Sequence, residues 1–190
     1  CEMTQIGLNV PPGFVMTTDA CLAFLEKDRL PEGAWDQTLV HMKALEKKTG
    51  KTFGGADNPL LVSVRSGSAM SMPGMMDTIL NLGLNTTTLK GLIALTGNER
   101  FGYDAWRRFI QLFGKIALNI GDEHFDAAMA QVKARYGARQ DVDLKAEHLA
   151  ELADAFLAIV ERHTGKPFPE DPYKQLEIAI GAVFRSWNGK

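Results

Sequence analysis

Apolar positions recur at helical spacing through the second half of the chain. Four stripes of hydrophobic residues, spaced three or four positions apart, are separated by short polar connections. The stripes lie over residues 105–116, 125–136, 149–160 and 176–187. Such stripes predict amphipathic helices that bury their apolar faces against one another as a bundle. We therefore predict an all-helical bundle subdomain over residues 84–190.

The first 83 residues have a different pattern, which predicts mixed α/β structure. Short apolar runs predict strands over 13–17 and over 60–65, the latter buried. We expect the first helix to be capped by Thr18 or Asp19, and a second helix to run over 34–48 and stop at Gly50. The predicted fold class is α+β, with one domain over 1–83 and a second over 84–190.

After residue 84 the pattern contains no convincing strand, and one further short helix is expected there. Thr86, Thr87 and Thr88 precede an apolar segment that ends near Gly97. Threonine hydroxyls accept hydrogen bonds from the free N–H groups of a first helical turn. We therefore expect one of these threonines to cap the helix.

Composition and charge exclude several classes of function. A net charge of -2 and a pI near 6.1 give no electrostatic reason to expect nucleic acid as a partner. No apolar run approaches the roughly 20 residues that a membrane span needs, so no membrane partner is expected. Cys1 and Cys21 form neither a metal-ligand cluster nor a disulfide pattern. We expect Cys21 to be buried on a helix, and a reducing cytoplasmic location.

Other polar side chains in the helical half are expected to have structural roles. The four histidines have no Cys partner and no His-x-x-x-His spacing, which favours surface or capping positions. These are His41, His124, His148 and His163. Arg107 and Arg108 lie three and four residues after Asp104, which favours ion pairs along one helix; contact with an anion or a neighbouring domain is the alternative.

The segment 62–78 carries the candidate chemistry. Arg65 lies at the end of the predicted strand and is followed by a loop rich in glycine and serine. A guanidinium can donate to two phosphate oxygens at once, and small residues let backbone N–H groups approach an anion. This pattern predicts a phosphate site. Turn chemistry at the glycines and a surface ion pair for Arg65 are the alternatives.

Four methionines and one aspartate extend this site. Met70, Met72, Met75 and Met76 are flexible apolar side chains, which suits a mobile lid over a planar base; filling of gaps in a core is the alternative. Asp77 could help place Mg²⁺ beside a phosphate. A turn or helix cap is the other interpretation of Asp77 and its neighbour Thr78, and the pattern favours the cap.

Several segments of the chain carry a resemblance to a known family. Residues 59–67, Pro-Leu-Leu-Val-Ser-Val-Arg-Ser-Gly, and 71–83, Ser-Met-Pro-Gly-Met-Met-Asp-Thr-Ile-Leu-Asn-Leu-Gly, closely resemble the ATP-binding domain of the pyruvate, phosphate dikinase family. Three other segments are similar to further parts of that domain, so the resemblance runs end to end. These are Gly-Leu-Asn-Val-Pro-Pro-Gly-Phe at 7–14 with Thr17 and Thr18, Arg-Phe-Gly-Tyr-Asp-Ala-Trp-Arg-Arg-Phe-Ile-Gln at 100–111, and Phe-Arg-Ser-Trp-Asn at 184–188.

The resemblance implies the fold and the site. It implies a partial ATP-grasp nucleotide-binding subdomain, followed by an inserted helical subdomain. It also implies that a Gly-Gly-Lys-Gly stretch precedes Cys1, and that the acidic Mg²⁺ ligands follow Lys190. The ATP- and phosphate-binding residues would be Arg65, Gly67, Ser68, Ser71, Met72, Pro73, Gly74, Met75, Asp77 and Thr78. Ser68 and Ala69 stand where many relatives have Ala and a basic residue, so an additional loop cation is absent.

The resemblance also implies an activity. Family members convert ATP, pyruvate and phosphate to AMP, phosphoenolpyruvate and pyrophosphate through a phosphohistidine on a swinging domain. ATP, Mg²⁺ and that swinging domain would be the partners of this segment. The whole enzyme would be a homodimer through another domain. Neither a catalytic residue nor a metal ligand is assigned to this chain, which alone would be inactive.

Two other functions compete with this interpretation. A phosphoenolpyruvate synthase-like dikinase is one, but such relatives typically have an acidic loop after Val-Arg-Ser rather than Met-Pro-Gly-Met-Met. A helical docking or regulatory module without nucleotide binding is the other. Retention of Arg65 and of the loop after it disfavours the second alternative.

Overall fold

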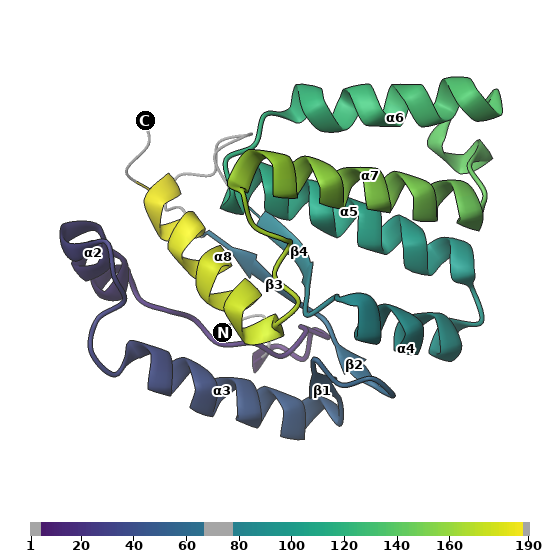
Figure 1. The fold of residues 1–190 in the computed structure, drawn as a ribbon. Helices are drawn as coiled ribbons and strands as arrows, with labels where there is room; N and C mark the ends of the chain where they lie inside the picture. Colours follow the sequence, from purple (N-terminus) through teal and green to yellow (C-terminus); the bar gives the residue numbers. More distant parts are fainter. Residues whose placement is uncertain (1–4, 67–77, 188–190) are drawn as a thin grey trace. The chain divides into compact units, whose positions relative to one another are not determined.

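The computed structural model describes residues 5–66 and 78–187, which form helices and short strands (Figure 1). This mixture agrees with the predicted α+β class. The chain groups into two compact units, Cys1–Lys51 and Thr52–Lys190. The division into compact units falls after Lys51, whereas the predicted domain boundary falls after residue 83. The boundary after residue 83 stays a prediction.

The described residues of the first unit include the helices α2 (Thr18–Lys27) and α3 (Ala34–Thr49). The prediction of α3 is confirmed to within one residue at its end. Gly50 terminates it in the left-handed conformation, with φ of 67°, and its N–H donates to the Glu46 carbonyl oxygen at 2.9 Å. The N-cap of α2 is Thr17, whose side chain makes no capping hydrogen bond, so the prediction of Thr18 or Asp19 as the cap is wrong. Cys21 is buried on α2 as expected.

The strand predicted over 13–17 is wrong. Residues 8–17 have no regular secondary structure. A strand requires a hydrogen-bonded neighbour, and the sheets that the described residues form consist of β1 with β2 and β3 with β4. Among residues 5–66 and 78–187, no strand therefore pairs with this apolar segment.

Two pairs of strands open the second unit. β1 (Thr52–Phe53) pairs in parallel with β2 (Pro59–Leu60), and β3 (Val62–Arg65) pairs antiparallel with β4 (Thr78–Leu82). The predicted strand over 60–65 is thus observed with an interruption at Leu61. It was expected to be buried, but β3 alternates between half-buried and exposed positions because only one face is covered. β4 was not predicted.

A bulge in β4 keeps its apolar side chains on one face. Val62 pairs with Leu82 and Val64 pairs with Ile79, so two residues of β4 lie opposite Ser63. One of them, Asn81, has a left-handed backbone with φ of 61°. The additional residue allows Ile79 and Leu82, three positions apart, both to be fully buried.

Five α-helices follow the strands, and no described residue after Leu82 belongs to a strand, as predicted. They are α4 (Thr86–Thr96), α5 (Glu99–Ala117), α6 (Asp122–Tyr136), α7 (Ala146–Thr164) and α8 (Pro172–Ser186), with a 3-10 turn, η1 (Asp141–Asp143), between α6 and α7. The described helices include none that is both long and apolar enough to cross a membrane.

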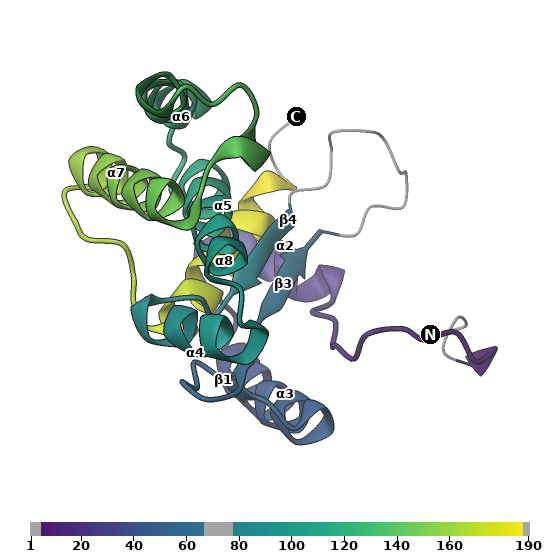
Figure 2. The ribbon, with the colours of Figure 1, turned by 90° about the vertical axis from the view of Figure 1, so that its right-hand side faces the viewer.

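The packing of these helices differs from the predicted four-helix bundle. α7 packs against both α5 and α6, whereas α8 packs against α5 and the β3–β4 pair (Figure 2). α5 therefore lies between a helical layer and the strands. Its buried Phe109 and Phe113 contact Phe168, and Phe125 of α6 contacts Phe156 of α7. The apolar stripes are buried as expected, but α8 covers the strands instead of closing a bundle.

Candidate functional site

Arg65 is the last residue of β3, and it is exposed. Its Nε donates a hydrogen bond to the Ser63 hydroxyl oxygen at 3.2 Å. Among the described residues, none forms an ion pair with Arg65. The guanidinium therefore keeps its charge and its terminal N–H groups available for an anion, as the predicted phosphate site requires.

Thr78 lies directly opposite Arg65 in the antiparallel pair. Side chains that face each other across two strands point to the same side of the sheet and lie about 5 Å apart at their Cβ atoms. Thr78 is half-buried while Arg65 is exposed. The structure thus brings together the two predicted site residues that it describes, at the end of the β3–β4 pair where residues 66–77 join the two strands.

The other predicted site residues fall on 67–77, which lie outside the described residues. They are Gly67, Ser68, Ser71, Met72, Pro73, Gly74, Met75 and Asp77, with Met70 and Met76 beside them. Their roles in binding phosphate, covering a base or placing Mg²⁺ stay predictions. The described residues themselves contain no group of three His, Cys, Asp or Glu side chains that could hold a metal ion.

A shallow cleft lies next to the strands, between β4, α5 and α6. Its volume is about 360 Å³. Its lining residues are Leu80, Asn81, Arg107, Arg108, Gln111, Leu112, Lys115, Asp122 and Asp126. The three cations are paired with carboxylates, since Arg107 and Arg108 bind Asp104 and Lys115 binds Asp122. The cleft therefore offers no unpaired cation to a phosphate.

The ion pairs of Asp104 with Arg107 and Arg108, at 2.7 and 2.8 Å, confirm the sequence prediction. The burial of Arg107 was not predicted: its side chain is only 4% exposed, and its Nη2 also binds Asp141 at 2.8 Å. Arg100, two helical turns earlier, donates to the Asp141 carbonyl oxygen at 2.8 Å. The prediction did not use the seven-residue spacing of these arginines, which places them on one helix face and could have indicated a shared partner.

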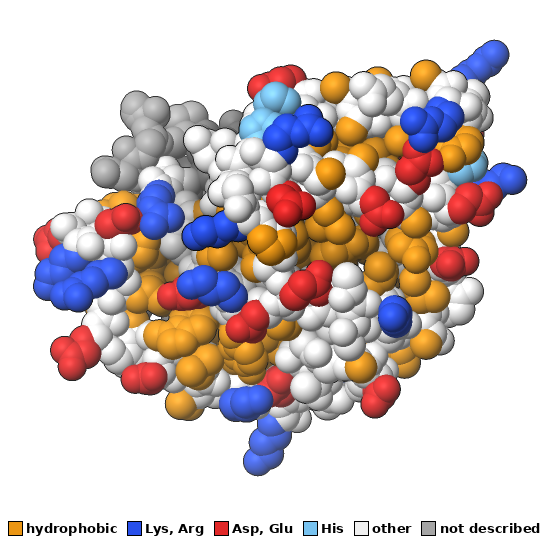
Figure 3. Space-filling view, viewed as in Figure 1, with side chains coloured by type: hydrophobic (Ala, Val, Ile, Leu, Met, Phe, Trp, Pro, Cys, Tyr) orange, Lys and Arg blue, Asp and Glu red, His pale blue; other side chains and the backbone are white. Residues whose placement is uncertain are grey.

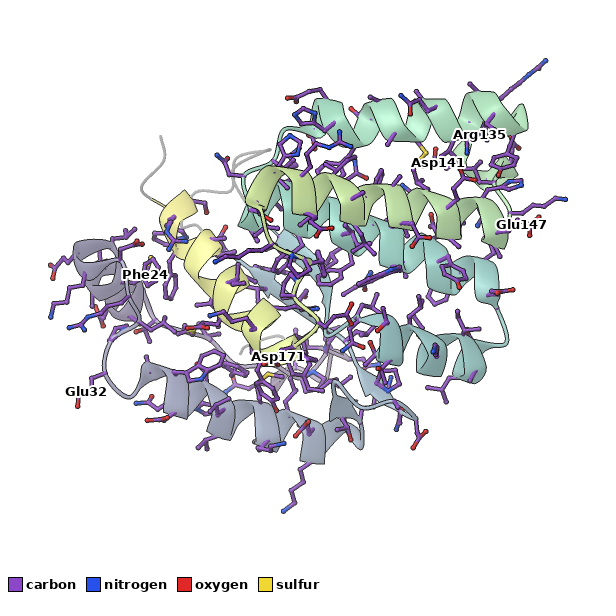
Figure 4. All side chains as sticks on the ribbon, viewed as in Figure 1. Phe24, Glu32, Arg135, Asp141, Glu147 and Asp171 are labelled. Carbon is purple, nitrogen blue, oxygen red and sulfur yellow. The ribbon has the colours of Figure 1, made fainter. Side chains whose placement is uncertain are left out.

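Asp141, which is labelled in Figure 4, lies on the η1 turn and is the centre of this charged cluster. Lys133 binds its second carboxylate oxygen at 2.5 Å. Hydrogen bonds from Lys133 and then Arg107 lower the pKa of Asp141 below its usual value, against the opposing effect of partial burial. The cluster fixes the connection between α6 and α7 to α5, which is a structural role.

The histidines occupy surface and capping positions, as predicted. His148 accepts a hydrogen bond at Nδ1 from the Lys145 backbone N–H at 3.2 Å, near the start of α7. The exposed rings of His124 and His163 contact each other, with centroids 4.2 Å apart. Basic and acidic side chains are intermixed on the face shown in Figure 3.

Comparison with curated proteins identifies relatives over the full length of the chain. It is 56% identical over 191 residues to pyruvate, phosphate dikinase of Entamoeba histolytica, a match that covers 100% of this chain and 22% of the relative. The resemblance to pyruvate, phosphate dikinase is confirmed. The enzyme of the same name from Giardia intestinalis is 51% identical over 97% of this chain and 21% of the relative.

A plant relative extends the same similarity. Pyruvate, phosphate dikinase 1, chloroplastic, of Arabidopsis thaliana is 45% identical over 98% of this chain and 19% of the relative. The chain therefore spans about a fifth of the length of these pyruvate, phosphate dikinases. No protein-family model matches the chain.

Proposed function

We propose that this chain is the ATP-binding part of a pyruvate, phosphate dikinase. The whole enzyme would convert ATP, pyruvate and phosphate to AMP, phosphoenolpyruvate and pyrophosphate through a phosphohistidine on another domain. The observation that carries the proposal is the exposed guanidinium of Arg65, without an ion pair among the described residues, in a chain similar to these enzymes over its whole length.

Arg65 would be the main cationic contact of this segment with the polyphosphate of ATP. Transfer of a phosphoryl group requires the negative charge on ATP to be neutralised and the reacting oxygens to be held in line. A guanidinium at a strand end can supply charge and bidentate geometry together. Thr78, on the same side of the strand pair, would add a hydroxyl near the bound phosphates.

The loop between these strands would complete the site within a partial ATP-grasp fold. Gly67, Ser68, Ser71 and Gly74 would offer backbone or hydroxyl donors to phosphate oxygens. A second group, consisting of Met72, Pro73 and Met75, would cover the nucleotide and exclude water. The helical subdomain over 84–190 would be an insertion beside this site.

Mg²⁺ would be held mostly by residues outside this chain. Such an ion takes carboxylate and phosphate oxygens, and Asp77 is the candidate ligand within the site segment. The described residues hold no group that fits a metal ion, so we assign no Mg²⁺ ligand among them. The other partners would be the swinging phosphohistidine domain and a second copy of the enzyme. The enzyme would act in the cytoplasm.

Labelling of the full-length enzyme that carries this chain tests the proposal. ATP labelled in the β-phosphate should transfer label to a histidine of the same polypeptide, as an acid-labile phosphate. Arg65→Ala should reduce this transfer at least a hundredfold, because an unpaired charge-stabilising donor is lost, while its melting temperature stays unchanged. Arg108→Ala, which removes an exposed arginine paired with Asp104, is the matched control and should retain transfer. Absence of any labelling of the unmodified enzyme, or full labelling of Arg65→Ala, would contradict the proposal.

A further inference from the structure

The contact between Ser63 and Arg65 has a geometry that bears on how the guanidinium is aimed. The two residues are two positions apart on β3, so their side chains lie on the same face of the strand, and both are exposed. The Arg65 Nε is 3.2 Å from the Ser63 hydroxyl oxygen. We propose that Ser63 is a positioning residue for Arg65, an inference that rests on the function proposed above.

The bulge in β4 lies directly across from Ser63. Leu80 and Asn81 both lie opposite this serine, and Asn81 has a positive φ. A bulge increases the local twist of a strand pair and changes the direction of nearby side chains. The bulge therefore affects the direction in which the exposed face of β3 points at Ser63. Arg65 is the next side chain on that face.

The choice of a serine as partner preserves the charge of the arginine. Arg107 and Arg108 direct their Nε atoms to the carboxylate of Asp104, whose negative charge offsets part of theirs. Arg65 directs its Nε to a neutral hydroxyl instead. This bond restricts the side chain through Nε and leaves the two terminal nitrogens, the pair that can bind two phosphate oxygens, free of it.

Restricting the Arg65 side chain before ATP binds lowers the entropic cost of binding. An exposed arginine has many rotamers, and a ligand that orders the side chain must offset the conformational entropy that is lost. A hydrogen bond from Nε to Ser63 confines the side chain before ATP arrives. Ser63 therefore acts on the ATP half of the reaction through Arg65, without touching the nucleotide itself.

The test measures coupling between the two residues in the full-length enzyme that carries this chain. Ser63→Ala should lower kcat/KM for ATP roughly threefold to tenfold, the value of one exposed hydrogen bond to a charged group. The KM for pyruvate should stay unchanged, because the effect is confined to the nucleotide site. Ser63→Thr keeps a hydroxyl on the same strand position and should restore most of the activity.

A second background separates positioning from a structural role. Arg65→Lys keeps the charge but has no Nε–H for the serine to hold. In that background Ser63→Ala should have no further effect on kcat/KM for ATP. Ser186→Ala, which removes another serine hydroxyl at the end of α8, is the control for hydroxyl loss and should leave the kinetics unchanged.

The outcomes distinguish this inference from the function on which it rests. If Arg65→Ala leaves ATP turnover intact, the proposed function itself fails. If Arg65→Ala abolishes turnover but Ser63→Ala behaves as the unmodified enzyme, only the positioning role is overturned. The same holds if the loss caused by Ser63→Ala persists in the Arg65→Lys background, or if Ser63→Ala lowers the melting temperature with kcat/KM for ATP unchanged.

Discussion

At the scale of single residues, buried charge is tolerated only where it is fully partnered. Arg107 is almost completely buried on α5, and Asp104 and Asp141 both form ion pairs with it. Removing a buried cation from water costs several kcal/mol unless such partners replace the solvent. Arg65 shows the opposite arrangement, with exposure and without an ion pair among the described residues, which suits binding rather than folding.

The lowered pKa of Asp141 predicts an acid-dependent loss of stability. A carboxyl whose pKa is lower in the folded state stabilises the fold above its unfolded pKa, near 3.8, and this contribution is lost as pH falls through the lower folded value. Asp141→Asn should therefore reduce the decrease in unfolding free energy between pH 5 and about pH 2.5. Urea unfolding of the enzyme at both pH values measures this difference.

The control for this experiment is Asp154→Asn, an exposed carboxylate on α7. It should leave the acid dependence unchanged. At neutral pH, Asp141→Asn should lower the unfolding free energy by about 1 kcal/mol, because its carboxylate is partly exposed and solvent screens its ion pairs. An equal acid dependence in Asp141→Asn and in the unmodified enzyme would contradict the role of Asp141.

At the scale of elements, reciprocal hydrogen bonds between Asn85 and the first turn of α4 cap the start of this helix. The Asn85 side chain accepts from the Thr87 and Thr88 N–H groups at 3.0 and 2.8 Å, and the Thr88 hydroxyl accepts from the Asn85 N–H at 2.8 Å. The Asn85 amide also donates to the Glu170 carbonyl oxygen at 2.9 Å. The cap thus joins α4 to the segment before α8.

Replacement of this cap predicts a graded loss of stability. Asn85→Ala should lower the unfolding free energy by about 2 kcal/mol, because it leaves buried backbone donors without partners. Asn98→Ala removes the cap of α5, which accepts one hydrogen bond from the Phe101 N–H in an exposed setting, and should cost only about 0.5–1 kcal/mol. Denaturant unfolding of both variants measures the order, and a larger loss for Asn98→Ala would contradict it.

Helices could be predicted from this sequence because their pattern is local. The apolar stripes of α5 to α8 identify the helices, and Gly50 and Gly97 end α3 and α4 as expected. The cap of α4 was assigned to a threonine, yet it is Asn85, whose further contact with Glu170 is distant in sequence. The segment 13–17 was wrongly predicted to be a strand, and β4 was not predicted. Both errors arise because strands depend on non-local partners.

The candidate site was predictable only in part for the same reason. Arg65 could be identified from its place after an apolar run, before glycine and serine. Its pairing with Thr78 and its bond to Ser63 depend on β4 and its bulge, which no local pattern fixes. The role of Asp141 depends on arginines more than thirty residues away, so the sequence offered only their spacing.

At the scale of the whole molecule, the chain is about a fifth of its relatives, and this predicts its behaviour toward ATP. A nucleotide site binds tightly when several walls enclose the ligand and its charges are all paired. Within this chain, the proposed contacts are Arg65, Thr78 and the loop between them, and the Mg²⁺ ligands would lie mostly elsewhere. The isolated chain should therefore bind ATP with a Kd weaker than about 1 mM.

Titration calorimetry of the chain against ATP and Mg²⁺, beside the full-length enzyme under the same conditions, checks this expectation. The full-length enzyme should bind at micromolar concentration, as is usual for enzymes that use ATP at cellular levels. Circular dichroism of the isolated chain should show its helices, so that weak binding is not mistaken for unfolding. Tight binding by the isolated chain would mean that Arg65 and its loop form a complete site, and the division of the site between this chain and the rest of the enzyme would be wrong.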